Sequence, residues 1–299
     1  MKNKIMKKKS IYEISKYSLV LVLTMLVMLS CSDDNSEISQ TETAADLDDI
    51  EAIAEAEDVG VLIDDISDII SFDFETSEAY KSEQAKSDFF RSYFSDCVVV
   101  TLVVEDKNVN VKLDFGDGCT GPHDQVLKGV ILASIQQISA SEMSINHTFE
   151  NFFVNEKEIT GSVSKIRTKQ NEDGFPEAIV TRDLTVTWKD ELSVTNKGKI
   201  TRTWIEGFGN KIWGDNVFLV TGSWTVSKNE ESLRTVEVIE ALRREMACRF
   251  LVSGKLQIES VRGDYMLDFG DGECDNLALV SKDDVEYEIE LGRARKWKK

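Results

Sequence analysis

Two short segments of the chain repeat residue types that bind divalent cations. They are Asp114-Phe115-Gly116-Asp117-Gly118-Cys119 and Asp268-Phe269-Gly270-Asp271-Gly272-Glu273-Cys274. Paired carboxylates on a glycine turn are hard oxygen ligands, so Asp114, Asp117, Asp268 and Asp271 are weak candidates for calcium binding. Calcium needs about six or more oxygen ligands, and this spacing supplies few. The alternative, which we favour, is a tight aspartate–glycine turn that brings the following cysteine into bonding position.

No catalytic constellation is evident in the sequence. The two histidines, His123 and His147, lie in different segments, so a two-histidine metal site is not predicted. The serines show no nucleophile elbow, and the carboxylates are too numerous to single out a pair. We therefore predict a protein that is not an enzyme and that needs no cofactor or metal, with a hydrolase as the less favoured alternative.

A glycine-containing loop between Gly207 and Asp215 carries two aromatic residues, Phe208 and Trp213. A tryptophan on such a loop can stack on a sugar or on a partner side chain, which makes Trp213 and Phe208 candidate ligand-binding residues. The alternative is that Trp213 closes one end of the core.

The N-terminus resembles the export signal of a bacterial lipoprotein. Basic residues are followed by an apolar run, 18–29, that is too short to span a bilayer. The run closes on Leu29-Ser30-Cys31, which resembles the lipobox cut by the lipoprotein signal peptidase. The resemblance implies a signal peptide at residues 1–30 and a diacylglyceryl (palmitate-type) anchor on Cys31.

The residues after the cysteine, Ser32, Asp33 and Asp34, resemble the lipoprotein export signal of Bacteroidota. There the motif marks lipoproteins for the outer face of the outer membrane. The resemblance therefore implies a lipid-anchored outer-membrane protein that faces the cell exterior, with a plain flexible tether as the alternative.

The four remaining cysteines form two pairs that follow an internal repeat. Each repeat has a cysteine, a strand, a turn, a second strand and an Asp-Phe-Gly-Asp-Gly segment before the next cysteine. Cys97 and Cys119 are symmetric about residue 108, and Cys248 and Cys274 about residue 261, both at predicted turns. An exported chain favours disulfides, and we predict Cys97–Cys119 and Cys248–Cys274.

The pattern of apolar residues predicts a mainly β protein. From Cys97 onward apolar and polar residues alternate, and 98–104 is almost wholly apolar, as in a strand buried on both faces. Turn signals at 171–174, 196–198 and 262–264 separate the runs. We predict an antiparallel sandwich or a strongly curled meander sheet of about ten strands, preceded by one or two short acidic helices.

The chain divides by composition into five segments. After the signal peptide we predict an acidic tether at 31–45, an acidic helical segment at 46–95 that packs on the sheet, a β domain at 96–292 and a basic tail at 293–299. Two apolar stripes at helical spacing are expected, with a break at Gly60 between them: Leu47, Ile50, Ile53 and Ala54 before it, and Leu62, Ile66, Ile69 and Ile70 after it.

The formal charge of the chain is −19, and the acidity is concentrated near the predicted anchor, where residues 31–96 hold 20 acids and three bases. This charge disfavours nucleic acid and anionic lipid surfaces as partners. We expect the acidic segment to be a solvated, repelling spacer.

The sequence from Leu242 to Gly254, and from Leu267 to Asn276, resembles a family of uncharacterised flavobacterial-type surface lipoproteins of Bacteroidota with repeated Asp-Phe-Gly-Asp-Gly-(x)-Cys motifs. The resemblance implies location and architecture but no activity. From the surface location and the disulfide-clamped β scaffold, we expect a surface lipoprotein that binds a glycan, an envelope protein or a lipid. The alternative is a structural or accessory envelope protein without a small ligand.

Overall fold

The computed structural model describes residues 34–76, 90, 93, 94, 96–105, 108–210, 212–259, 263–283 and 285–292. The predicted signal peptide, Cys31, Ser32, Asp33 and the basic tail 293–299 lie outside these residues. The chain divides into two compact units, residues 1–50 and 51–299.

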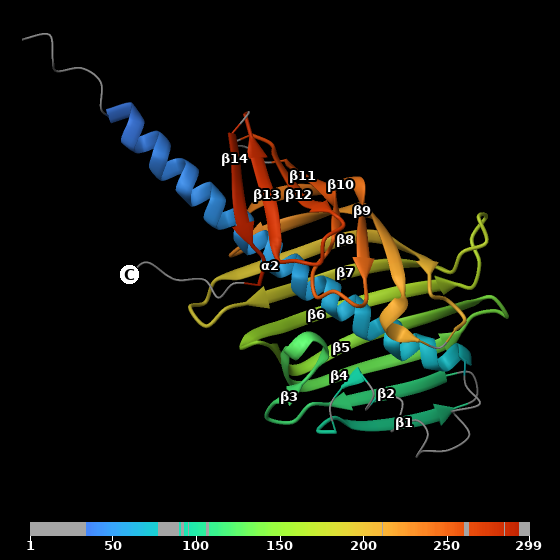
Figure 1. Cartoon of the computed structure of the whole chain (residues 1–299). Helices are drawn as coiled ribbons and strands as arrows, with labels where there is room; N and C mark the ends of the chain where they lie inside the picture. Colours follow the sequence, from blue (N-terminus) through green and yellow to red (C-terminus); the bar gives the residue numbers. More distant parts are fainter. Residues whose placement is uncertain are drawn as a thin grey trace, which may run out of the picture. The chain divides into compact units, whose positions relative to one another are not determined.

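The second unit is built on one antiparallel sheet of 14 strands, which is not closed (Figure 1). Each strand pairs with its neighbours along the chain, except that β2 pairs with β4, and β3 pairs only with β4. The strands are β1 (Val99–Glu105), β2 (Asn108–Asp114), β3 (Cys119–Thr120), β4 (Val126–Gln137), β5 (Glu142–Val154), β6 (Lys157–Thr168), β7 (Glu177–Thr187), β8 (Ser193–Glu206), β9 (Val217–Lys228), β10 (Glu231–Glu245), β11 (Ser253–Glu259), β12 (Tyr265–Asp271), β13 (Leu277–Lys282) and β14 (Val285–Glu290).

The predicted mainly β class is confirmed, and of its two forms the curled meander is the observed one. The strand count was underestimated because several turns lack a glycine or proline signal. Asn155-Glu156 and Asn229-Glu230 connect long strands with both residues at positive φ, as in two-residue hairpin turns.

One predicted turn is wrong. Residues 196–198 lie inside β8, where Gly198 faces Trp224 of β9. A Cβ at Gly198 would come within 2.4 Å of the Trp224 Cα, so this glycine permits close strand packing and makes no turn. The other two turn regions do separate strands, β6 from β7 and β11 from β12.

The apolar run 98–104 is also not a strand buried on both faces. β1 ends the strand order, and Val99, Val103 and Val104 are 62%, 46% and 55% exposed. Local sequence reports apolarity but not the position of a strand in the sheet, and an edge strand has only one neighbour.

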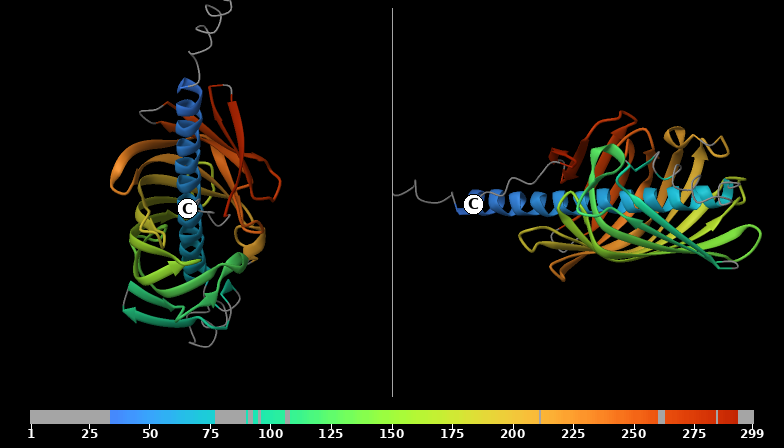
Figure 2. Two further views of the ribbon diagram at one scale, coloured as in Figure 1. Left: turned by 90° about the vertical axis from the view of Figure 1, so that its left-hand side faces the viewer. Right: turned by 90° about the horizontal axis from the view of Figure 1, so that it is seen from below.

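A single helix, α2 (Asp34–Thr76), replaces the expected tether and the one or two short helices. It runs through Gly60 without a break and starts inside the stretch 31–45. From Glu51 onward it belongs to the second unit, and the sheet curves around this part of it (Figure 2). All residues from Val59 to Ser71 are buried, so both its apolar and its acidic sides are enclosed.

The two predicted disulfides are present, Cys97–Cys119 and Cys248–Cys274, each with a Cα–Cα distance of 5.6 Å. The pairing is as predicted, although the first hairpin register is not. Val99 faces Asp114 in β2, so β1 and β2 turn before residue 108, and Cys119 lies beyond β2 in β3. The Asp-Phe-Gly-Asp-Gly turn supplies the extra residues that return Cys119 to Cys97.

Candidate functional site

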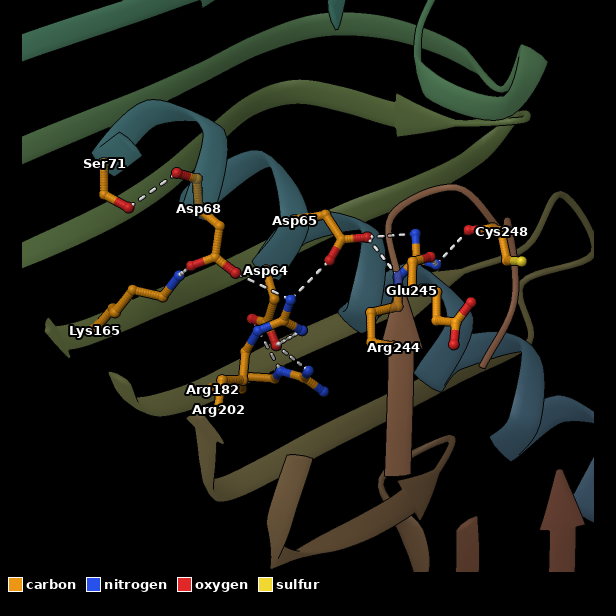
Figure 3. Close-up of polar contacts among 10 residues, drawn as sticks. All are labelled: Asp64, Asp65, Asp68, Ser71, Lys165, Arg182, Arg202, Arg244, Glu245 and Cys248. Carbon is orange, nitrogen blue, oxygen red and sulfur yellow. Dashed lines mark hydrogen bonds and ion pairs between the residues drawn. The ribbon is translucent and has the colours of Figure 1, made fainter. Parts of the chain in front are cut away.

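The most elaborate group of polar side chains joins α2 to the inner face of the sheet (Figure 3). Its members are all buried and come in equal numbers of acids and bases. We call this group the helix–sheet charge network, and its members are Glu57, Asp64, Asp65 and Asp68 of α2, Lys165 of β6, Arg182 of β7, Arg202 of β8 and Arg244 of β10.

Arg182 binds two acids that lie two helical turns apart. Its Nη1 donates to Glu57 Oε1 at 2.9 Å, and its Nη2 donates to Asp64 Oδ2. Gly60 lies between them on α2, and a Cβ there would be 2.7 Å from Arg182 Nη1. The absence of a side chain at Gly60 therefore gives the guanidinium its place against the helix.

Arg202 and Arg244 share Asp65. Arg202 Nη2 donates to Asp65 Oδ1 at 2.8 Å and lies 3.0 Å from Asp68 Oδ2, and Arg244 Nε donates to Asp65 Oδ2 at 2.9 Å. Arg244 also donates to the backbone carbonyl of Cys248, so the network reaches the second disulfide.

The network extends toward the C-terminal end of α2. Lys165 Nζ pairs with Asp68, and Arg167 Nη1 donates to Ser71 Oγ at 2.9 Å. Towards its other end, Glu55 accepts from Trp188 Nε1 at 3.0 Å.

Burial and opposite charge act against each other in this group. Burial alone would raise the pKa of Asp68, but Lys165 and Arg202 outweigh it, so the pKa of Asp68 lies below its ordinary value. Burial raises the pKa of Glu57 despite the attraction of Arg182, and burial lowers the pKa of Lys165 despite Asp68. Each charge is held by a partner, and the arrangement positions and fixes α2 on the sheet.

The sequence prediction missed this network and misplaced its acids. Asp64, Asp65 and Asp68 are not part of a solvated spacer; they are enclosed by bases of the sheet. The sequence did contain an indication of these buried bases, because each basic residue takes a core position in the alternation of its strand. The core-facing residues are Val163-Lys165-Arg167, Val180-Arg182-Leu184, Ile200-Arg202-Trp204 and Leu242-Arg244-Met246.

Two of the four candidate calcium ligands, Asp114 and Asp268, accept local backbone hydrogen bonds of the turn type. Asp114 Oδ1 accepts from the Gly116 N–H at 3.0 Å, and Asp268 Oδ1 accepts from the Gly270 N–H at 2.9 Å. Asp114 also pairs with Lys112 at 3.0 Å, and Asp268 with Lys255 at 3.4 Å. Phe115 and Phe269, which follow them, are both buried. Asp117 and Asp271 are exposed, and no group of three or more metal-ligating side chains occurs among the described residues.

The two loop aromatics have different surroundings. Trp213 is 8% exposed. It packs edge-on against Tyr93, with ring centroids 5.7 Å apart, and its ring is tilted against that of Phe218, with centroids 6.3 Å apart. Its position fits the alternative that it closes an end of the core. Phe208 is 45% exposed and contacts Trp204 and Phe175 edge-on.

The two histidines are not brought together by the strand pairing. His147 lies on the inner face of β5, where burial lowers its pKa to about 3. His123 lies in the short 3₁₀ turn Pro122–Asp124, and burial also lowers its pKa.

A groove of about 340 Å³ crosses the outer face of β1, β2, β4 and β5, and we call it the outer groove. One side is the cross-strand row Thr101, Lys112, Leu132 and Thr148, whose members face one another in register. The other side is the adjacent row Val103, Asn110, Ser134 and Asn146. Val111 and Ala133 lie between the rows, with side chains buried on the inner face, so the floor there is backbone.

Comparison with protein-family models, with curated proteins and with solved structures finds no match to this chain. Among the helical residues that the structure describes, none forms a segment long and apolar enough to cross a membrane. The family resemblance noted from the sequence therefore stays a prediction.

Proposed function

We propose that this protein is a lipid-anchored lipoprotein of the outer membrane that faces the cell exterior and binds a protein partner without catalysing a reaction. The anchor rests on the lipobox-like residues that end at Cys31, and the outward location on Ser32, Asp33 and Asp34. The structure adds a surface suited to binding, the outer groove.

The outer groove carries the binding part of the proposal. Its volume of about 340 Å³ is in the range of ligand sites, and its lining is mainly apolar. Leu132, Val103 and the threonine methyl groups supply apolar contact, while Asn110, Asn146 and Lys112 place amides and an ammonium among them. Since none of the described residues that line it is aromatic and could stack on a sugar, the groove favours amphipathic polypeptide over glycan.

The test is photo-crosslinking of the full chain in cells. A photoreactive residue at Thr148, on the groove, should give a protein adduct, whereas the same residue at Thr221, exposed on β9, should not. Leu132→Lys should abolish the adduct while leaving the melting temperature of the protein unchanged, since Leu132 lies on the outer face.

The nature of the adduct decides between the candidate ligands. A lipid or glycan adduct at Thr148 would replace the protein partner with that ligand. Equal adduct yields at Thr148 and Thr221 would contradict the groove as a binding site and favour the structural alternative.

A further inference from the structure

The two edges of the sheet differ in how they are protected against pairing. Edge strands expose unpaired backbone groups, and proteins usually shield them with charge. β14 carries Glu286, Glu288 and Glu290, whereas β1 has no charged residue before Glu105 and exposes Val99, Val103 and Val104. Within the part of the chain that the structure describes, β1 is therefore the unshielded edge.

The two edge strands also differ in whether they can pair with themselves. We consider antiparallel pairing that keeps the outer faces of two copies continuous. With Leu102 on the two-fold axis, Thr101 faces Val103, Val100 faces Val104, and Val99 faces Glu105. No like charges meet. In β14, by contrast, a two-fold axis at any residue from Glu286 to Glu290 places glutamate opposite glutamate, which is destabilising.

We propose that β1 pairs with β1 of a second copy of this chain, antiparallel and with Leu102 on the two-fold axis. The resulting dimer has the symmetry that is commonest among homo-oligomers. It goes beyond the proposed function, because the pairing needs no ligand.

The outer groove selects this register. The groove opens on β1 between Thr101 and Val103, so its midline at β1 passes position 102. A two-fold axis through Leu102 aligns the Thr101 row of each copy with the Val103 row of the other copy. The two grooves then become one. Since strands are about 4.8 Å apart, a groove crossing eight strands is about 38 Å long and suits an extended ligand.

Pairing across β1 can be tested with one cysteine in the full chain. Opposed Cα atoms in an antiparallel ladder are about 4.5–5.5 Å apart, within the range that a disulfide spans. The four cysteines of the β domain are already bridged. Leu102→Cys should therefore give a disulfide-linked dimer in cells. Its yield should exceed that of the matched edge variant Glu288→Cys by about tenfold, because β14 is not in the interface.

A charge-exchange experiment separates a second copy from any other occupant. Thr101 and Val103 face each other across the axis and point outward, so changing them leaves the inner core untouched. Thr101→Lys/Val103→Lys and Thr101→Glu/Val103→Glu should each prevent self-association, and mixing them should restore a dimer. Analytical ultracentrifugation of each detergent-solubilised chain measures this.

Three results would overturn the proposal. The first is a Leu102→Cys dimer yield no higher than that of Glu288→Cys. The second is crosslinking of Leu102→Cys to a different protein. The third is protection of its thiol from alkylation without any dimer, which would mean that the chain's own residues cover β1. Loss of the Thr148 adduct with an intact dimer would count against the proposed function alone.

Discussion

Asp65 of α2 and Arg244 of β10 are 179 residues apart in the sequence and form an ion pair of 2.8 Å inside the protein. Arg244 also donates to the carbonyl of Cys248, whose disulfide partner is Cys274. One carboxylate on the helix is thus connected through one guanidinium to a covalent bridge of the sheet. The helix is fixed by directed charge pairs as well as by apolar packing.

The first prediction concerns the cost of breaking the helix–sheet charge network. Arg202→Met removes a base that Asp65 and Asp68 share. Asp65 keeps Arg244 and Asp68 keeps Lys165, but the buried network is left with four acids against three bases, so one buried negative charge has no compensating base. The free energy of unfolding should fall by about 3–5 kcal/mol, because an unpaired buried charge is costly. Urea denaturation measures the change.

An exposed ion pair provides the matched control. Lys197 and Asp183 are 2.6 Å apart on the outer face, and their side chains are 68% and 49% exposed. Lys197→Met should cost less than about 1 kcal/mol. Similar losses for Arg202→Met and Lys197→Met would contradict the distinction drawn here between the two locations.

The second prediction concerns Gly60. Alanine is normally better than glycine inside a helix by about 1 kcal/mol. At Gly60, however, the new Cβ would lie 2.7 Å from Arg182 Nη1 and would displace a guanidinium that Glu57 and Asp64 hold. Gly60→Ala should therefore lower the melting temperature, while Gly214→Ala, with open space around it, should not. Stabilisation by Gly60→Ala would show that Arg182 moves at little cost.

The sequence predicted the elements that local patterns encode. Alternation indicated the strands, and the repeat identified the partners Cys97–Cys119 and Cys248–Cys274. It did not predict the enclosure of Asp64, because the pairing with Arg182 depends on residues 118 positions away. In the sequence alone, the acids of α2 are compatible with a solvent-exposed helix face. Only the fold shows that basic residues at core positions of the sheet lie opposite them. Likewise, the exposure of β1 follows from the strand order, which the run of valines does not contain.

The third prediction concerns the loop aromatics. Trp213 is buried against Tyr93 and Phe218, so Trp213→Ala should cost about 3–5 kcal/mol of stability. Phe208→Ala, at a position 45% exposed, should cost much less. Thermal unfolding of the two variants decides the matter. An unchanged melting temperature for Trp213→Ala would instead support Trp213 as a residue that stacks on a ligand.

The fourth prediction concerns the anchor. If Cys31 carries the lipid, Cys31→Ser should prevent labelling with palmitate and leave residues 1–30 uncut. Asp33→Ala/Asp34→Ala should keep the lipid but leave the protein on the inner side of the outer membrane, protected from protease added to whole cells. Palmitate labelling of Cys31→Ser would refute the anchor, and unchanged protease sensitivity of the double variant would refute the export signal alone.

The fifth prediction concerns the pH dependence of stability. Burial raises the pKa of Asp58 from 3.8 to about 6, more than the attraction of Arg249, Lys157 and Arg244 lowers it. Between these pH values the unfolded chain has lost the Asp58 proton and the folded chain retains it. The contribution of Asp58 to the free energy of unfolding therefore falls as the pH rises from about 4 to 6, and it stays low above pH 6.

Asp58→Asn removes this contribution. The variant should be more stable than the original chain by about 2 kcal/mol at pH 7 and nearly equal to it below pH 4. Asp190→Asn, at an exposed position, should match the original chain within about 0.5 kcal/mol at both values. The measurement is urea unfolding at pH 3.5 and pH 7. Destabilisation by Asp58→Asn at pH 7 would mean that the attraction of the neighbouring bases outweighs the burial of the carboxylate, so that its pKa lies below 3.8.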